Sequence, residues 1–227
     1  MPANWLKLSR TDVSEPVWDN SARRGPAAAL DFTERMLIVI LYGWFLWRML
    51  WGVSTLEISS LLVVTAEALP LAFVLFRKPT EKLSRNPADW VLALLGTTMP
   101  LFVSPPAQET GSVAATYFAY GMIVFGLFVQ IAAKVVLGTR FGIVAANRGV
   151  CALGPYRFVR HPMYAGYTLT HIGFLIAMPD ATNAAIYVAA LILQLARIDR
   201  EERVLMQDPR YEVFAGRVGY RLLPGVY

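Results

Sequence analysis

Cysteine and histidine are scarce in this sequence of 227 residues, and their scarcity excludes several kinds of site. The single cysteine, Cys151, rules out an internal disulfide and a cysteine-rich metal site. The two histidines, His161 and His171, form no His-based metal motif, so we expect no bound metal. Neither a G-x-G-x-x-G sequence nor a P-loop sequence occurs, which leaves the familiar nucleotide sites of soluble proteins without support.

Charge is scarce as well. Charged residues make up 16% of the chain, whereas soluble proteins have about 25%. Hydrophobic residues make up 56%. This is the composition of an integral membrane protein, in which the distribution of positive charge is more informative than the net charge of +5.

Long apolar runs divide the chain at 33–53, 56–76, 88–104, 113–137, 162–178 and 182–199. A helix needs about 20 residues to cross a bilayer, and about 17 is the lower limit, so each run is admissible. If all of them cross and the N-terminus is inside, 20 of the 21 Lys and Arg residues lie in the inside segments with the adjoining helix ends, 1–35, 77–87, 134–161 and 197–227. Only Arg48 remains, near the outer end of the first run. We therefore expect an all-α, polytopic membrane protein with about six transmembrane helices and both termini in the cytoplasm.

Three parts follow from this pattern. Residues 1–32 are polar and are expected to form a cytoplasmic N-terminal tail. Residues 33–137 form a four-helix transmembrane region. Residues 138–227 contain a long loop, a transmembrane hairpin and a C-terminal segment, which we expect to be the catalytic part. In that last segment Tyr211, Phe214 and Val218 recur at helical spacing, which predicts a short amphipathic helix on the cytoplasmic surface or over a site.

The segment 154–166, GPYRFVRHPMYAG, concentrates polar rings and arginines between apolar runs. Pro162 favours a helix that begins at Pro162 or just after it. Arg160, His161 and Tyr164 therefore lie where a cytoplasmic loop becomes a membrane helix, beside a helix N-terminus suited to an anion. The alternative is an interfacial belt of Arg and Tyr that only anchors a helix end.

The polar residues inside the apolar runs have two interpretations each, and the small residues have one. Glu67 in the second run is expected to face protein or water, as a structural hydrogen-bonding group or as part of a substrate pocket. His171 in the fifth run is either an interhelical hydrogen-bonding group or a catalyst. Gly121 and Gly126 are expected to let the fourth helix pack closely against a neighbour.

The sixth helix is expected to continue beyond the membrane as LARIDREERVLM. Gln194, Arg197, Glu201 and Leu205 fall on one face of it. Arg197 and Glu201 could be no more than an ordinary ion pair between positions i and i+4 on a solvated helix end.

These motifs together resemble the isoprenylcysteine carboxyl methyltransferase family. The resemblance rests on G-P-Y, R-H-P-x-Y-x-G, the helical hairpin and R-x-x-x-E-E, over about residues 134–227. It implies a bacterial-type member in the inner membrane that binds S-adenosyl-L-methionine and methylates a lipophilic acceptor. Arg197 matches the arginine assigned to the substrate carboxylate, and Phe141 replaces a cofactor-contacting glutamine. The residues that match cofactor-contacting positions are Arg148, Gly149, Val150, Cys151, Tyr156, His161, Pro162, Met163, Tyr164 and Glu201.

The acceptor class decides whether a base is needed. A carboxylate is already ionised at neutral pH and needs none, whereas a thiol or a phospholipid amine must lose a proton, which makes Glu202 or His171 a candidate base. The resemblance implies Arg197 and Glu201 as catalytic residues, and Glu202 is added as a candidate base. Two other functions stay open: a membrane reductase that uses NADPH, and a non-enzymatic scaffold whose basic loops bind anionic lipid headgroups.

Overall fold

The computed structural model describes residues 26–52, 68–69, 71–76, 83–103, 112–177 and 179–226. Over these residues the chain is helical and contains no strand, only an isolated bridge between Leu83 and Ala146. The all-α class is confirmed. The elements are α1 (Pro26–Gly52), α3 (Pro87–Thr98), η3 (Met99–Phe102), α4 (Val113–Leu137), η4 (Gly138–Arg140), η5 (Gly154–Arg157), α5 (Pro162–Ala177), α6 (Ala181–Leu205) and α7 (Pro209–Arg217).

The apolar runs locate most of these helices. Helices α4, α5 and α6 occupy the fourth, fifth and sixth runs, α5 begins at Pro162 as predicted, and α6 continues past the apolar run. Helix α1 begins at Pro26, inside the segment assigned to the tail, because proline suits a first helical turn and the next residues, AAAL, are strong helix formers. The third run is helical only to Thr98 and then tightens into η3, since Pro100 cannot donate a helical hydrogen bond. Glu67 lies outside the described residues.

Within the part of the chain that the structure describes, two segments, Val113–Arg140 and Ala181–Leu205, are long and apolar enough to cross a membrane. Only 28% and 33% of their most apolar windows are buried within the protein. Large apolar side chains therefore face outward along them, as lipid contact requires. The number of crossings and the side on which the termini lie stay predictions. The exposed side chains include Tyr117, Phe118, Phe125 and Phe128 on α4, and Val188 and Ile192 on α6.

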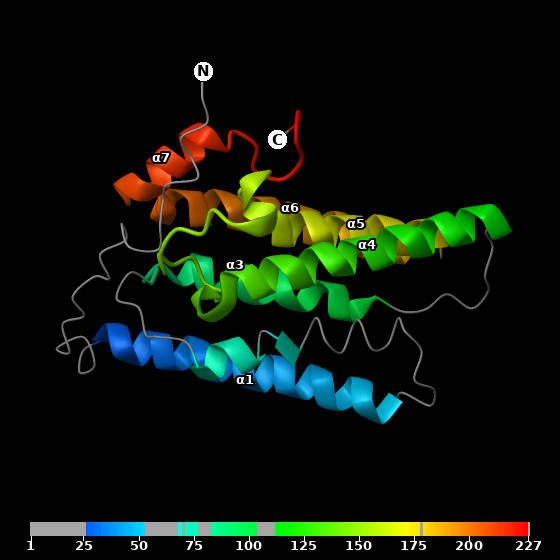
Figure 1. Ribbon diagram of the computed structural model, residues 1–227. Helices are drawn as coiled ribbons and strands as arrows, with labels where there is room; N and C mark the ends of the chain where they lie inside the picture. Colours follow the sequence, from blue (N-terminus) through cyan, green and yellow to red (C-terminus); the bar gives the residue numbers. More distant parts are fainter. Residues whose placement is uncertain are drawn as a thin grey trace, which may run out of the picture.

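The axes of the long helices are roughly parallel, with α4 beside α5 and with α1 on the side of the bundle opposite α6 and α7 (Figure 1). The contact between α4 and α5 is close at glycines. A Cβ atom on Gly126 would lie 2.8 Å from the carbonyl oxygen of Gly166, and one on Gly166 would lie 2.7 Å from that of Gly126. The prediction of close packing is confirmed for Gly126. It is wrong for Gly121, which is exposed and would place a Cβ atom with no neighbour within 4 Å.

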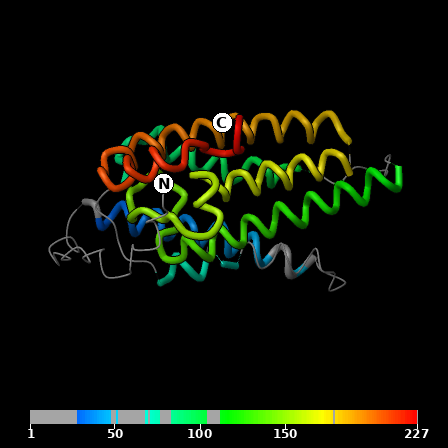
Figure 2. The backbone as a smooth tube through the Cα atoms, turned by 45° about the horizontal axis from the view of Figure 1, so that its top comes forward, coloured from blue at the N-terminus to red at the C-terminus, as the bar shows by residue number. Residues whose placement is uncertain are grey.

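One end of the bundle carries most of the irregular structure. The segment from η4 to the start of α5 folds over this end, and α7 and the C-terminal segment lie beside it (Figure 2). Helix α7 is the short helix predicted from the spacing of Tyr211 and Phe214, and Val218 is its C-terminal cap. Its two buried aromatic residues pack with Tyr156 and Ala133, so α7 is fixed to the bundle through its apolar face.

Candidate functional site

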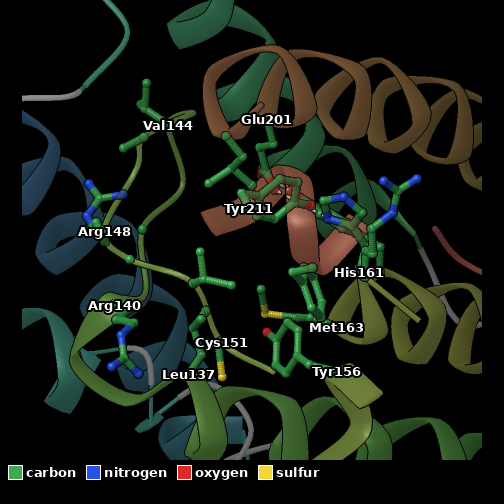
Figure 3. Close-up of a pocket in the computed structure, with 18 residues that line it drawn as sticks. Leu137, Arg140, Val144, Arg148, Cys151, Tyr156, His161, Met163, Glu201 and Tyr211 are labelled. Atoms are coloured by element: carbon green, nitrogen blue, oxygen red, sulfur yellow. Dashed lines mark hydrogen bonds and ion pairs between the residues drawn. The ribbon is translucent and has the colours of Figure 1, made fainter. Parts of the chain in front are cut away.

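A cavity that opens to solvent lies at this end of the bundle. Figure 3 shows its labelled lining, which comes from the end of α4, the following loop, the start of α5, the end of α6 and α7. Among the predicted cofactor residues, those that line the cavity are Arg148, Gly149, Val150, Cys151, Tyr156, His161, Met163, Tyr164 and Glu201.

Pro162 is the predicted cofactor residue that does not line the cavity. Its side chain is fully buried at the first position of α5. Proline at this position needs no backbone N–H donor, because the first turn of a helix leaves its donors without helical partners. Pro162 therefore sets where α5 begins and lets His161 and Met163 on either side of it reach the cavity.

Glu201 is the centre of the polar cluster in the cavity. The hydroxyl of Tyr164 donates a hydrogen bond to Oε1 of Glu201. Nδ1 of His161 lies 3.7 Å from Oε2 of the same carboxylate. The cavity wall contains no second acid among the described residues, whereas Arg148, Arg160 and an arginine from η4 supply positive charge. The arrangement thus offers one carboxylate for a cation and several cationic groups for an anion.

Glu202 faces away from the cavity, although it follows Glu201 directly. Neighbouring residues of a helix differ by about 100° in direction, so only one of such a pair can point at a given site. Oε1 of Glu202 accepts hydrogen bonds from the Tyr211 hydroxyl at 2.6 Å and Nε2 of His161 at 2.8 Å. Nη1 of Arg160 lies 3.0 Å from Oε2. Glu202 is buried and joins three parts of the site, and the catalytic role expected of it stays a prediction.

The C-terminal segment holds the residues before α5 in place. The backbone N–H of Arg160 donates to the carbonyl of Tyr220 at 2.9 Å, and that of His161 donates to the carbonyl of Arg221 at 2.8 Å. Leu222 is buried against Tyr164. The position of the His161 ring is therefore determined by backbone pairing as well as by Glu202.

Helix α1 supports the opposite wall of the cavity through Glu34. This side chain is completely buried, and its Oε1 accepts hydrogen bonds from the backbone N–H groups of Ile143 and Val144, both at 2.9 Å. Its Oε2 pairs with the guanidinium of Arg148. The sequence interpretation missed Glu34, which belongs to the charged start of an otherwise apolar run. Its four-residue spacing with two inward-facing apolar residues, Ile38 and Tyr42, was the available signal.

Phe141 lies behind this wall. It is buried and meets the ring of Tyr42 edge to face, with the centroids 6.4 Å apart. It does not line the cavity. The position at which the resemblance implies a cofactor-contacting glutamine is therefore occupied here by part of the apolar core beneath the loop.

Arg197 lies beside the cavity without lining it. Its Nη2 donates to the carbonyl of Ile143 at 2.8 Å, and its guanidinium lies 5.3 Å from the centre of the Tyr164 ring. Its Nη2 is also 4.0 Å from Oε1 of Glu201. The Nε atom is buried with no hydrogen-bond partner among the described residues. A buried guanidinium with a spare donor suits an anionic group that approaches from this side.

His171 is far from this cluster along α5. Its ring stacks on that of Tyr187, with 4.4 Å between the centroids, and it does not line the cavity. The structure therefore favours the structural interpretation of His171 over the catalytic one.

The loop and the C-terminal helix are joined beneath the cavity. Asp208 caps α7 by accepting the backbone N–H of Arg210 at 3.0 Å, and it also accepts Nδ2 of Asn147 at 3.0 Å. Hydrogen bonds from Arg210 and Asn147 hold the pKa of Asp208 well below its usual range. Burial raises the pKa of Tyr156, and burial together with the hydrogen bond to Glu202 raises that of Tyr211. Both phenols therefore stay protonated and available as donors at neutral pH.

Residues 119–207 match the model of the isoprenylcysteine carboxyl methyltransferase (ICMT) family. The predicted resemblance to this family of methyltransferases is confirmed over these residues. A search of curated proteins found no match to the chain. The matched segment contains α5, α6 and most of the cavity wall, but it ends before α7 and excludes α1.

Proposed function

We propose that this protein is an integral membrane methyltransferase that uses S-adenosyl-L-methionine to methylate the carboxylate of a lipophilic acceptor. The observation that carries the proposal is the convergence of His161, Tyr164 and Glu201 on one cavity inside the segment that matches a methyltransferase family. The outward-facing apolar side chains of α4 and α6 support a lipid environment beside that cavity.

The chemistry of the cavity wall fits the methyl donor. S-adenosyl-L-methionine supplies a methyl group on a sulfonium, with an ammonium, a carboxylate and a ribose attached. Glu201 would bind the ammonium or the ribose hydroxyls, and Arg148 would attract the carboxylate. The rings of Tyr156 and Tyr164 would bind the sulfonium by cation–π attraction, worth roughly 0.5–2 kcal/mol.

The residues around the cavity would act by alignment and by exclusion of water. Methyl transfer is an in-line displacement, so its rate depends on how well the two reactants are held. His161 and Tyr164 are both fixed by carboxylates, and α7 covers the cavity with Tyr211 and Phe214. A site so constructed would orient a donor with little rearrangement of its own side chains.

A carboxylate acceptor fits better than a thiol or an amine. The two candidate bases, Glu202 and His171, do not line the cavity, and Glu202 is already bonded by His161 and Tyr211. A carboxylate needs no base. Arg197, with its buried spare donor, would bind and aim that carboxylate.

The proposal is tested by ligand-induced stabilisation of the purified protein in detergent. S-adenosylhomocysteine should raise the melting temperature, whereas NADPH should not. Glu201→Ala and His161→Ala should each abolish the stabilisation, because each removes a polar group from the cavity wall. His171→Ala provides the control, since His171 lies in α5, the helix that follows His161, but does not line the cavity. Stabilisation by NADPH alone would favour a reductase, and normal binding by both cavity variants would refute the assigned site.

A further inference from the structure

The cavity wall formed by residues 142–150 has no regular secondary structure of its own. Gly142, Val144, Ala146, Arg148, Gly149 and Val150 all line the cavity. A segment of this kind depends on outside partners for its conformation, because it lacks the repeated backbone hydrogen bonds of a helix or strand. Those partners determine the shape of the wall.

The partner on the far side of the wall is Glu34 of α1. Both of its oxygens are used by the wall: Oε1 by two successive backbone N–H groups and Oε2 by the guanidinium of Arg148. The carboxylate is completely buried, and the Arg148 side chain is only 7% exposed. A buried pair of this kind resists rearrangement, because separating it would leave a charge without a partner away from water.

The residue at the centre of the wall is held from two directions. Ile143 donates its N–H to Glu34 and accepts a hydrogen bond through its carbonyl oxygen from Arg197 at 2.8 Å. Helix α1 and helix α6 thus both attach to Ile143. The side chains of Phe141, Ile143 and Val144 also pack against Ile38 and Tyr42 of α1.

We infer that Glu34 is a positioning residue for the donor site, and that α1 thereby sets the affinity of the cavity for its methyl donor. This inference rests on the proposed function for the identity of the ligand. It goes beyond the matched family segment, which begins at residue 119 and does not contain α1. Glu34 acts through Val144 and Arg148, which touch the cavity, and does not itself reach it.

The charge and the shape of Glu34 have separable effects. Glu34→Gln keeps the volume and one oxygen for the backbone N–H groups but removes the counter-charge of Arg148. Glu34→Ala removes both. The donor affinity should therefore fall in the order wild type, Glu34→Gln, Glu34→Ala. A role that is only structural would instead make affinity follow the melting temperature, whichever variant is used.

The matched control is Asp31→Asn in the same helix. Asp31 is also buried, one turn before Glu34, and it forms an ion pair with Arg35 at 3.5 Å rather than with the wall. The Asp31→Asn substitution removes a buried carboxylate from α1 while leaving the contacts of Ile143 and Val144 in place. Its donor affinity should stay within about twofold of wild type.

The experiment combines two measurements on the full chain in detergent. The dissociation constant for S-adenosylhomocysteine is measured by calorimetry, and backbone hydrogen exchange is measured by mass spectrometry without ligand. Glu34→Ala should weaken binding roughly tenfold or more, as expected for the loss of a buried charged partner. It should also speed exchange at Ile143 and Val144 while α4 and α5 exchange as in wild type.

The affinity and the exchange measurements each test the role of Glu34. Unchanged affinity in Glu34→Ala, or unchanged exchange at Ile143 and Val144, would overturn the inference. Faster exchange throughout α4 and α5 would also overturn it, because the variant would then be globally destabilised. If wild type itself does not bind S-adenosylhomocysteine, the proposed function is wrong, and the exchange data alone still decide whether Glu34 holds the wall.

Discussion

Asn147 and Asp208 are joined by a hydrogen bond of 3.0 Å between Nδ2 and Oδ2, although they lie 61 residues apart in the chain. Asn147 also accepts the backbone N–H of Gly149 at 2.9 Å, so its side chain connects the cavity wall to the start of α7. The wall therefore depends on the C-terminal part of the chain as well as on α1. The Glu34 carboxylate joins the wall to α1, and the Asp208 carboxylate joins it to α7.

The carboxylate of Asp208 should make stability depend on acid pH. Its pKa is lowered in the folded protein, so its contribution is present above the unfolded value of about 3.9 and is lost as the pH falls below it. Thermal unfolding in detergent between pH 5 and pH 2 should show this loss in wild type. Asp208→Asn keeps a helix-capping side chain but should show a flatter pH dependence.

Replacement of Asp208 by Ala should be more severe. It removes the cap of α7 and the link to Asn147 together, and loss of a cap alone costs about 0.5–2 kcal/mol. Equal melting temperatures for the Ala variant and wild type at pH 7 would contradict the capping role.

The phenol of Tyr211 should make stability depend on alkaline pH. Its pKa is raised in the folded protein, so its contribution is complete below the unfolded value of about 10 and declines above it. Tyr211→Phe should cost about 1–3 kcal/mol at pH 8, because a buried oxygen of Glu202 loses a donor. The difference from wild type should shrink between pH 10 and pH 11, and a constant difference would argue against a raised pKa for this phenol.

Removal of the Tyr164 hydroxyl should weaken binding of the methyl donor. Tyr164→Phe keeps the ring beside Arg197 but removes the hydroxyl that donates a hydrogen bond to the Glu201 carboxylate. The orientation of that carboxylate in the cavity is then less well fixed. We expect about fivefold weaker binding of S-adenosylhomocysteine, or about 1 kcal/mol, by calorimetry. Tyr187→Phe is the control, since Tyr187 stacks on His171 away from the cavity. Equal effects of the two changes would show that the hydroxyl of Tyr164 has no specific role.

A methyl group at Gly126 should separate α4 from α5. Its Cβ atom would lie 2.5 Å from Oγ1 of Thr170 and 2.8 Å from the carbonyl of Gly166, so backbone must move. Overpacking of this kind costs about 1–3 kcal/mol, which thermal unfolding should detect. Gly121→Ala in the same helix has no neighbour within 4 Å and should leave stability unchanged or slightly raised. A reversed order would be inconsistent with the close contact.

The site could be predicted from sequence where its residues are close together in the chain. His161, Met163 and Tyr164 follow one another around a proline that starts a helix, so their common location needs no knowledge of tertiary structure. The choice between Glu201 and Glu202 could not be made in the same way, because it depends on how α6 is rotated against its neighbours. That rotation is decided by packing, which no local pattern records.

Glu34 shows why the rest of the site was not predictable. Its partner Ile143 lies 109 residues away, and the bond is to a backbone N–H, which every residue except proline possesses. No side-chain type at residue 143 could therefore indicate the pairing. The early start of α1 had a different cause: its first residues are helix formers whose signal was outweighed by the polar tail before them.

The glycine contacts between α4 and α5 limit how a ligand can reach the cavity. A Cβ atom on Gly126 or Gly166 would lie only 2.7–2.8 Å from the facing carbonyl oxygen, so the two backbones are in direct contact and cannot approach further. Helix α7 and the loop before α5 are attached to this pair by apolar packing and side-chain hydrogen bonds, so we expect any widening of the cavity to involve them before α4 and α5 separate. If the proposed function is correct and product release limits turnover, the hydrogen bonds of Asp208 and Glu202 would influence the turnover rate.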